Sequence, residues 1–239
     1  MHGCLVTATD TGVGKTILSA ALTAALRAAG HPVQAYKPVV TGLDEIHPLW
    51  PADHELLART AAMAPQRVAP ERFGPAVSPH LAAARAGRTL EPARLVERAR
   101  KAGRRGPVVV EGVGGLLAPL TEHWNVRDLA RALGLPVIIA ARPGLGTINH
   151  TLLTLEAARA GGLDVRAVVL TPWPGEPDEM QLSNRQTIAR LGAVRVEGLG
   201  QVDAPDPALL AQAGRRLPYA QWLGPARPSL RLAPSASSF

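Results

Sequence analysis

The sequence predicts an α/β fold in which a mainly parallel sheet is covered by helices on both faces. Short apolar runs rich in β-branched residues alternate with longer segments of helical periodicity, most of which end at a glycine. This alternation is typical of strands joined by helical crossovers. The expected strands are residues 4–7, 32–37, 107–110, 136–141, 165–170 and, more weakly, 193–196. The expected helices are residues 16–29, 54–64, 91–102, 126–133 and 149–160.

The 239 residues, 46% of them hydrophobic, are enough for one sizeable core, so a single domain over residues 1–224 is expected. Residues 43–51 have the composition of a loop. Residues 64–79 contain so many prolines that no regular structure is expected there. Residues 225–239 are rich in Pro, Ser and Arg, which predicts a flexible C-terminal tail.

Composition argues against several classes of protein. No apolar run reaches the roughly 20 residues of a membrane-spanning helix, and the N-terminus lacks the features of a signal peptide, so a cytoplasmic protein without membrane contact is expected. Cys4 is the only cysteine, which excludes an internal disulfide and a cysteine-based zinc site. The net charge of +7 is spread along the chain and only 3% of residues are aromatic, so no nucleic-acid partner is expected.

Lysine is rare in this chain, occurring only as Lys15, Lys37 and Lys101, while arginine supplies the other basic charges. Lys15 belongs to the segment ATDTGVGKT, residues 8–16, which lies between a predicted buried strand and a predicted helix. Successive backbone N–H groups in such a loop can wrap a triphosphate at the positive end of the helix dipole. Lys15 can reach the β- and γ-phosphates, and the Thr16 hydroxyl can ligate Mg²⁺. The segment therefore predicts a fold of the P-loop NTPase type.

The loop departs from the general pattern G-x-x-x-x-G-K-[ST], because Thr9 stands where the first glycine is usual. It resembles instead the G-T-D-T-x-V-G-K-T loop of dethiobiotin synthetases, with Ala8 in place of their first glycine. Four further segments are similar to that family in order and spacing, from residue 3 to about residue 170, and their joint occurrence is highly specific. They are YKPVVTG at 36–42, SPH at 78–80, VEGVGGLLAPL at 110–120 and GTINHTLLT at 146–154.

The resemblance implies an ATP-dependent cyclo-ligase of biotin biosynthesis, in which 7,8-diaminononanoate takes up CO₂ as a carbamate. The nucleoside triphosphate phosphorylates the carbamate, and ring closure gives dethiobiotin. Mg²⁺ would be the cofactor and Thr16, Asp53 and Glu111 its ligands. Asp53 is equally plausible as a helix N-cap, and Asp44 in the preceding loop stays an alternative metal ligand. The catalytic residues implied are Lys37, Lys15 and Thr11.

The resemblance also implies which residues bind the two substrates. In the family the helix that starts at GTINH binds the substrate's carboxylate across a homodimer interface, which would involve Thr147 and Asn149. His80 and His150 are interpreted as structural histidines. The expected substrate-binding residues are Thr11, Lys37, Thr41, Pro79, Gly114, Thr147 and Asn149. The expected nucleotide-binding residues are Gly12, Val13, Gly14, Lys15, Thr16, Ile17, Asp53, Glu111, Gly112, Val113, Gly114, Thr171, Pro172, Gly200, Gln201 and Val202.

The part that would recognise the base departs from the family. Many members carry an asparagine that reads adenine after the strand at 165–170, whereas this chain continues Thr171, Pro172, Trp173. ATP is the default nucleotide, and a relaxed or different base preference stays open.

Two other classes share a similar loop. A partition-type or switch ATPase would be compatible with the basic charge, but such proteins usually carry a second lysine where this chain has Asp10, and they lack YKPVVTG. An amidotransferase-linked cobyrinate-type synthase would need a cysteine nucleophile in a further domain, and only Cys4 is present.

Overall fold

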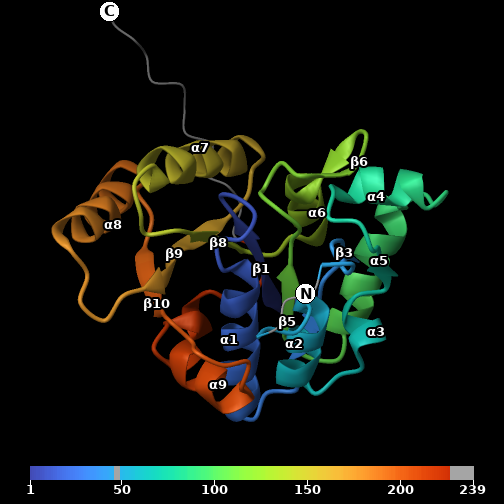
Figure 1. Ribbon diagram of the computed structural model, residues 1–239, viewed down its shortest axis with the longest axis horizontal. Coiled ribbons are helices and arrows are strands. Elements are labelled where there is room, and N and C mark those ends of the chain that lie inside the picture. The colour runs from blue at the N-terminus through green and yellow to red at the C-terminus, as the bar shows by residue number, and fades with distance from the viewer. Residues whose placement is uncertain (46–48, 227–239) are drawn as a thin grey trace, which may run out of the picture.

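Six parallel strands form the central sheet of the computed structural model, which describes residues 1–45 and 49–226 (Figure 1). The strand order is β10-β9-β8-β1-β5-β2, so β1 lies inside the sheet with β8 on one side and β5 on the other. The parallel sheet confirms the predicted fold class. The strands are β1 (Gly3–Ala8), β2 (Gln34–Tyr36), β5 (Val108–Glu111), β8 (Val137–Ala141), β9 (Val165–Trp173) and β10 (Val196–Gly200).

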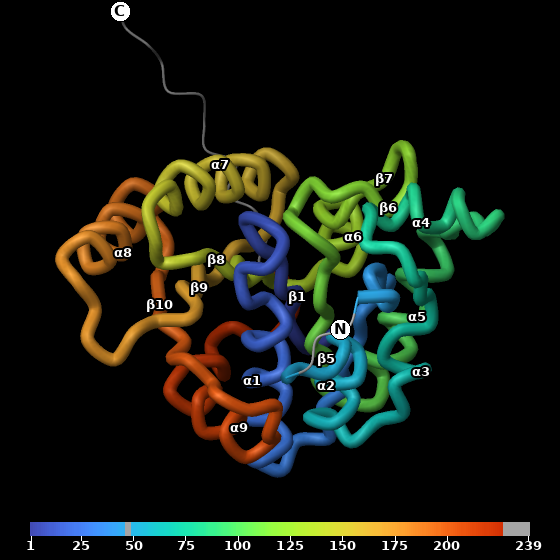
Figure 2. The backbone as a smooth tube through the Cα atoms, viewed as in Figure 1, coloured from blue at the N-terminus to red at the C-terminus, as the bar shows by residue number. Residues whose placement is uncertain are grey.

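Helices pack on both faces of the sheet because successive strand residues point to opposite sides. In β1, Cys4 and Val6 join one hydrophobic cluster and Leu5 joins the other. The first cluster is covered by α1 (Lys15–Ala28), α2 (Asp53–Ala61) and α9 (Pro207–Arg215). The second is covered by α5 (Pro92–Gly103), α6 (Val126–Leu133), α7 (Thr147–Ala160) and α8 (Glu179–Leu191). Figure 2 traces the chain through both layers.

Helix α1 packs very closely against α9. A Cβ on Gly214 would collide with the carbonyl oxygen of Ala21 and would lie 2.9 Å from the Cβ of Ala25, so the two backbones are in contact. Only glycine at 214 and alanine at the facing positions of α1 permit this distance. The helix that follows the phosphate loop is therefore buried between the sheet and α9.

Residues 64–79 contain regular structure, so the expectation from their prolines was wrong. Helix α3 (Pro65–Val68) begins with proline at its first position, where the missing N–H costs nothing. Strand β4 (Glu71–Arg72) pairs with β3 (Val39–Val40), and α4 (Pro79–Arg85) also begins at a proline. The last strand, expected at residues 193–196, is instead β10 at Val196–Gly200.

Helices α8 and α9 were not predicted from the sequence, although both carry helix-start signals. Asp178 and Gln181 form a capping box before α8, and Asp206 accepts hydrogen bonds from the first turn of α9. The remaining elements are the hairpin of β6 (Pro119–Thr121) and β7 (Trp124–Asn125) and the short 3₁₀ helix η1 (Tyr219–Gln221).

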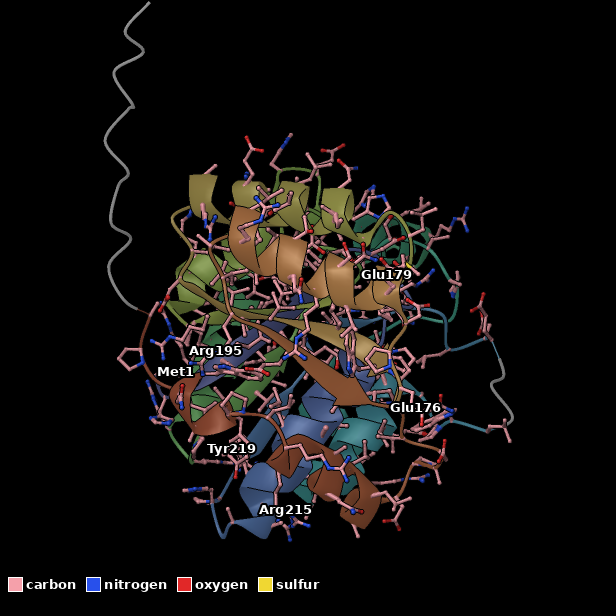
Figure 3. All side chains as sticks on the ribbon, turned by 90° about the vertical axis from the view of Figure 1, so that its left-hand side faces the viewer. Met1, Glu176, Glu179, Arg195, Arg215 and Tyr219 are labelled. Carbon is pink, nitrogen blue, oxygen red and sulfur yellow. The ribbon has the colours of Figure 1, made fainter. Side chains whose placement is uncertain are left out.

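The end of the described chain is fastened to the sheet. Arg166 on β9 donates to the carbonyl oxygens of Gln221, Leu223 and Pro225, and Gly224 N donates to Gly3 O. Arg195, labelled in Figure 3, donates to the Gln221 side chain. Residues 227–239 of the predicted tail lie outside the described residues, so that boundary stays a prediction. Among residues 1–45 and 49–226, no helix is long and apolar enough to cross a membrane.

Candidate active site

The loop between β1 and α1 has the backbone shape that its glycines allow. Gly12 and Gly14 have φ of +69° and +88°, a region that other residues rarely adopt. Gly14 is the N-cap of α1, and a Cβ there would lie 2.8 Å from the methyl carbon of Thr171. Val13 is buried, whereas Asp10, Thr11 and Gly12 are exposed. The loop therefore presents its backbone to solvent at the N-terminus of a buried helix, which suits an anion.

Lys15 is the first residue of α1 and is only 7% exposed. Within the described part of the chain its ammonium has no hydrogen bond or ion pair. Burial lowers the pKa of this lysine, and the nearby charge of Lys37 lowers it further. A buried ammonium without an acceptor gains a partner when a phosphate binds, as expected for this position.

Side chains from three elements, α1, α2 and β5, meet Lys37, which follows β2 directly. The Lys37 ammonium donates to Glu111 Oε1 at 2.5 Å and to Asp53 Oδ2 at 2.6 Å. Glu111 ends β5 and is fully buried, while the Asp53 side chain is 45% exposed at the start of α2. The Thr16 hydroxyl donates to the same Glu111 oxygen at 2.9 Å. The structure thus brings together Thr16, Lys37, Asp53 and Glu111, all four of them predicted site residues.

The ion pairs change the pKa values in this cluster. Burial alone would lower the pKa of Lys37, but the charges of Asp53 and Glu111 outweigh burial and raise it. Burial alone would raise the pKa of Asp53, but the charge and hydrogen bond of Lys37 outweigh it and lower this pKa to about 2. Lys37 and Asp53 are therefore both charged at neutral pH.

The lowered pKa of Asp53 predicts a pH-dependent contribution to stability. A carboxylate with a depressed folded pKa stabilises the fold above its ordinary value of 3.8, and this contribution is lost as the pH falls through about 2. We expect Asp53→Asn to lower the urea midpoint at pH 6 and to differ progressively less from the wild type between about pH 4 and pH 2. A difference that stays constant over this range would show that the charge of Asp53 contributes nothing.

The donor set fits Mg²⁺. This ion takes one or two protein carboxylates and completes its octahedron with phosphates and water. Glu111 Oε2 is buried and has no hydrogen-bond partner among the described residues, and Asp53 is open to solvent. In the described ranges, no group of three or more His, Cys, Asp or Glu is placed to hold a metal alone. The arrangement suits a metal that arrives with a nucleotide.

The structure places Asp53, and not Asp44, in this cluster. Asp53 is the first residue of α2, where Ala52 is the N-cap and no side chain caps the helix, so the N-cap interpretation of Asp53 was wrong. The Asp44 carboxylate packs against Gly74 instead. Residues 46–48, part of the segment 43–51 that was expected to be a loop, lie outside the described residues.

The predicted substrate-binding residues lie around the phosphate loop and are less closely packed than the cluster around Lys37. The Thr11 hydroxyl lies 3.6 Å from the position of a Cβ on Gly114, so the turn after Glu111 meets the phosphate loop at Thr11. Thr41 follows β3 and is half-buried, and Pro79 is buried at the start of α4. Thr147, the first residue of α7, is buried and 3.5 Å from Thr151 through their hydroxyls.

The two segments expected to recognise the base lie on neighbouring strands. Trp173 at the end of β9 is paired in register with Gly200 at the end of β10, which leads into Gln201 and Val202. The Thr171 side chain is buried against Gly14, and Pro172 is exposed. The segment that carries asparagine in many dethiobiotin synthetases thus offers no side-chain amide at residues 171–173.

Arg142 lies beside the phosphate loop and was not among the predicted site residues. It follows β8 directly, and its Nη2 donates to Thr11 O at 3.4 Å. The sequence signal was available, because a charged residue directly after a buried parallel strand lies at the edge where ligands of such sheets bind.

Comparison with known proteins gives the family. The AAA domain family matches residues 2–205. An ATP-dependent dethiobiotin synthetase of Anaeromyxobacter dehalogenans strain 2CP-1 is 46% identical over 80% of this chain and 86% of its own length. That of Novosphingobium aromaticivorans is 42% identical, covering 89% of this chain and 95% of its own. The chain belongs to the dethiobiotin synthetase family. The resemblance drawn from the loop and its companion segments is thereby confirmed.

Solved structures show that the chain shares its fold with more distant proteins. The MinC:MinD cell division complex of Aquifex aeolicus matches with a TM-score of 0.56 at 12% identity, covering 90% of this chain and 95% of that chain. The cell division ATPase MinD of Pyrococcus furiosus matches with a TM-score of 0.52 at 16% identity, over 90% and 99%. Identities this low show the fold alone. The alternative of a partition-type or switch ATPase is not favoured.

Proposed function

We propose that the chain makes dethiobiotin from 7,8-diaminononanoate, CO₂ and a nucleoside triphosphate, in the cytoplasm, at the site between the phosphate loop and Lys37. The observation that carries this proposal is the Lys37–Glu111–Thr16 contact, which joins the YKPVVTG and VEGVGG segments to the phosphate loop. These are the segments that distinguish the dethiobiotin synthetase resemblance from that of a general P-loop protein.

Three steps follow from the chemistry of the substrates. An uncharged amine attacks CO₂ and releases a proton, giving a carbamate. A carbamate oxygen attacks the γ-phosphorus, and the nucleoside diphosphate leaves. The neighbouring amine then attacks the carbonyl carbon, and phosphate leaves as the ring closes. The Thr11 and Thr41 hydroxyls would hold the diamine and the carbamate.

The second step makes the largest electrostatic demand, because one anion must attack another. Lys15 and Lys37 supply positive charge to the phosphates and the carbamate. Mg²⁺, when bound with the nucleotide, supplies further charge at the β- and γ-phosphates, and Thr16, Asp53 and Glu111 would hold it. The role of Lys37 requires its ammonium to turn from the two carboxylates toward the substrate.

Phosphate release with and without the diamine and bicarbonate tests this function. We expect release to depend on both, and dethiobiotin to appear in equal amount. Release that is unaffected by the diamine but rises with DNA would contradict the assignment and support a switch ATPase.

We propose that base selection is relaxed, with ATP as one of several usable nucleotides. The side chains at residues 171–173 offer no amide, and the Thr171 side chain is buried against Gly14. We expect kcat/KM for ATP, CTP, GTP and UTP to agree within about tenfold, equivalent to ~1.4 kcal/mol of discrimination. A preference for ATP of roughly a hundredfold or more would contradict relaxed selection.

We propose that α7 forms part of a homodimer interface through which Thr147 and Asn149 reach the partner's substrate. Leu145 is 95% exposed just before α7, and Leu153 within it is 57% exposed. Large apolar side chains exposed both at the entry to a helix and within it are typical of an interface. We expect Leu153→Glu to give a monomer in sedimentation and a raised KM for the diamine. Leu209→Glu, at an exposed position of α9, should leave both unchanged. A Leu153→Glu variant that remains a dimer would contradict the proposal.

A further inference from the structure

Arg142 and Lys37 stand on opposite sides of the phosphate loop. Lys37 follows β2, beyond β5, whereas Arg142 follows β8, the neighbour of β1 on the other side. Because the strands are parallel, both residues lie at the carboxyl edge of the sheet, where the loop begins. The loop therefore has a cationic side chain on each flank.

The Arg142 side chain is held over the loop by a weak contact. Its Nη2 lies 3.4 Å from Thr11 O, which is long for a hydrogen bond, and 3.6 Å from the position of a Cβ on Gly12. Arg142 is exposed and has no ion pair with any described carboxylate. Most of the five N–H donors of its guanidinium are thus free. Glycine at 12 leaves open the space beside the guanidinium.

The contact lies at the γ-phosphate end of the loop. Thr11 lies close to Gly114, in the turn that follows Glu111, and Glu111 is hydrogen-bonded to Thr16. The predicted metal ligands and Thr11 are therefore on the same side of the loop. Lys15, whose ammonium serves the β- and γ-phosphates, begins the helix just beyond.

The charges of the site leave a role for a further cation. The ammonium of Lys37 is neutralised by Asp53 and Glu111, and the loop itself carries Asp10, whose carboxylate accepts from Thr11 N. A triphosphate and a carbamate add several negative charges to this site. Among the cationic side chains at the loop, Arg142 and Lys15 have no carboxylate partner in the described structure.

We propose that Arg142 is a catalytic residue that binds the phosphoryl group during its transfer, as an arginine supplied by the same chain. This inference rests on the proposed function. The bond from the carbamate oxygen to the γ-phosphorus forms while the bond to the β–γ bridging oxygen breaks, and the electron pair leaves with the nucleoside diphosphate. The guanidinium neutralises the charge that grows on the bridging and equatorial oxygens. Its planar fork suits two phosphate oxygens better than an ammonium does.

Steady-state kinetics of Arg142→Ala and Arg142→Lys test the inference. We expect Arg142→Ala to lower kcat on the order of 10³-fold, the lower end of the range for such arginines, and to change the KM for nucleotide less than about threefold. Added guanidinium should restore part of kcat in Arg142→Ala alone. Arg142→Lys should retain intermediate activity. Arg131→Ala is the matched control, because Arg131 is an exposed arginine of α6 that pairs locally with Asp128.

A second measurement does not depend on turnover. The wild type should bind a nucleoside diphosphate with aluminium fluoride, a mimic of the transferring phosphoryl group, far more tightly than Arg142→Ala does. Both proteins should bind the diphosphate alone equally well. This difference between the two ligands would also exclude misfolding as the cause of lost activity.

Three results would overturn the inference. They are a kcat of Arg142→Ala within about fivefold of the wild type, a change confined to KM, and equal affinity of the two proteins for the aluminium fluoride complex. If the wild type showed no diamine-dependent turnover, the proposed function itself would fall, and this inference with it. Normal wild-type turnover with an unimpaired Arg142→Ala would overturn the inference alone.

Discussion

Replacing Lys37 by methionine should lower kcat by roughly 10³-fold or more, the range found when a positioned charge is removed from a phosphoryl-transfer site. Methionine keeps much of the buried stem but removes the ammonium that would meet the carbamate and the γ-phosphate. Product formation measured at saturating substrates checks this. Retained activity would remove Lys37 from the mechanism. Lys101→Met, at an exposed position of α5, is the control.

The same substitution should also destabilise the fold. Lys37 is paired with a fully buried Glu111, and removing one partner of such a pair costs about 3–5 kcal/mol, because the other charge stays buried. The sequence alone does not show this pairing, which only the structure brings together. The double variant Lys37→Met/Glu111→Gln should regain much of this stability in urea titrations. If the single variant is as stable as the wild type, the ion pair contributes nothing.

Glu111→Gln should lower turnover by about 10²- to 10³-fold, through loss of charge at the metal position rather than loss of shape. The amide can still accept from Thr16, but it can no longer neutralise Lys37 or provide a charged oxygen to Mg²⁺. Mn²⁺ binding in the presence of a nucleoside diphosphate, followed by electron paramagnetic resonance, should weaken in parallel.

Glu97→Gln on α5 is the matched control for Glu111→Gln, because Glu97 is exposed and has no ion pair in the described structure. It should leave turnover and Mn²⁺ binding unchanged. A Glu111→Gln protein with unaltered Mn²⁺ affinity would show that the metal is held elsewhere, and Asp44 would then return as a candidate.

The sheet and the phosphate loop could be predicted because their signals are local. Buried strands, helical periodicity and the run from Gly12 to Thr16 are contiguous in the sequence. The choice between Asp53 and Asp44 could not be made in this way, because it depends on which carboxylate the chain brings to Lys37 after a loop. The position of Arg142 directly after a buried strand was a local signal that could have been used, but its contact with Thr11 could not be predicted, because it joins residues 131 positions apart.

The prediction of short helices and strands was wrong for a different physical reason. Residues 64–79 were expected to be irregular because proline disfavours helix interiors and strands. Pro65 and Pro79 instead stand at helix starts, where their fixed φ is favourable. The two-residue pairing of β3 with β4 depends on a partner more than 30 residues away, which no local pattern reveals.

The contact of α1 with α9 has a consequence for the thermodynamics of nucleotide binding. Because Gly214 packs directly against Ala21, the position of α1 relative to α9 is fixed. The N–H groups at the start of α1 therefore keep a constant direction. Such preorganisation means that binding orders little backbone and loses little conformational entropy. A bulky residue at 214 would act on nucleotide affinity through the middle of the helix, without touching the ligand.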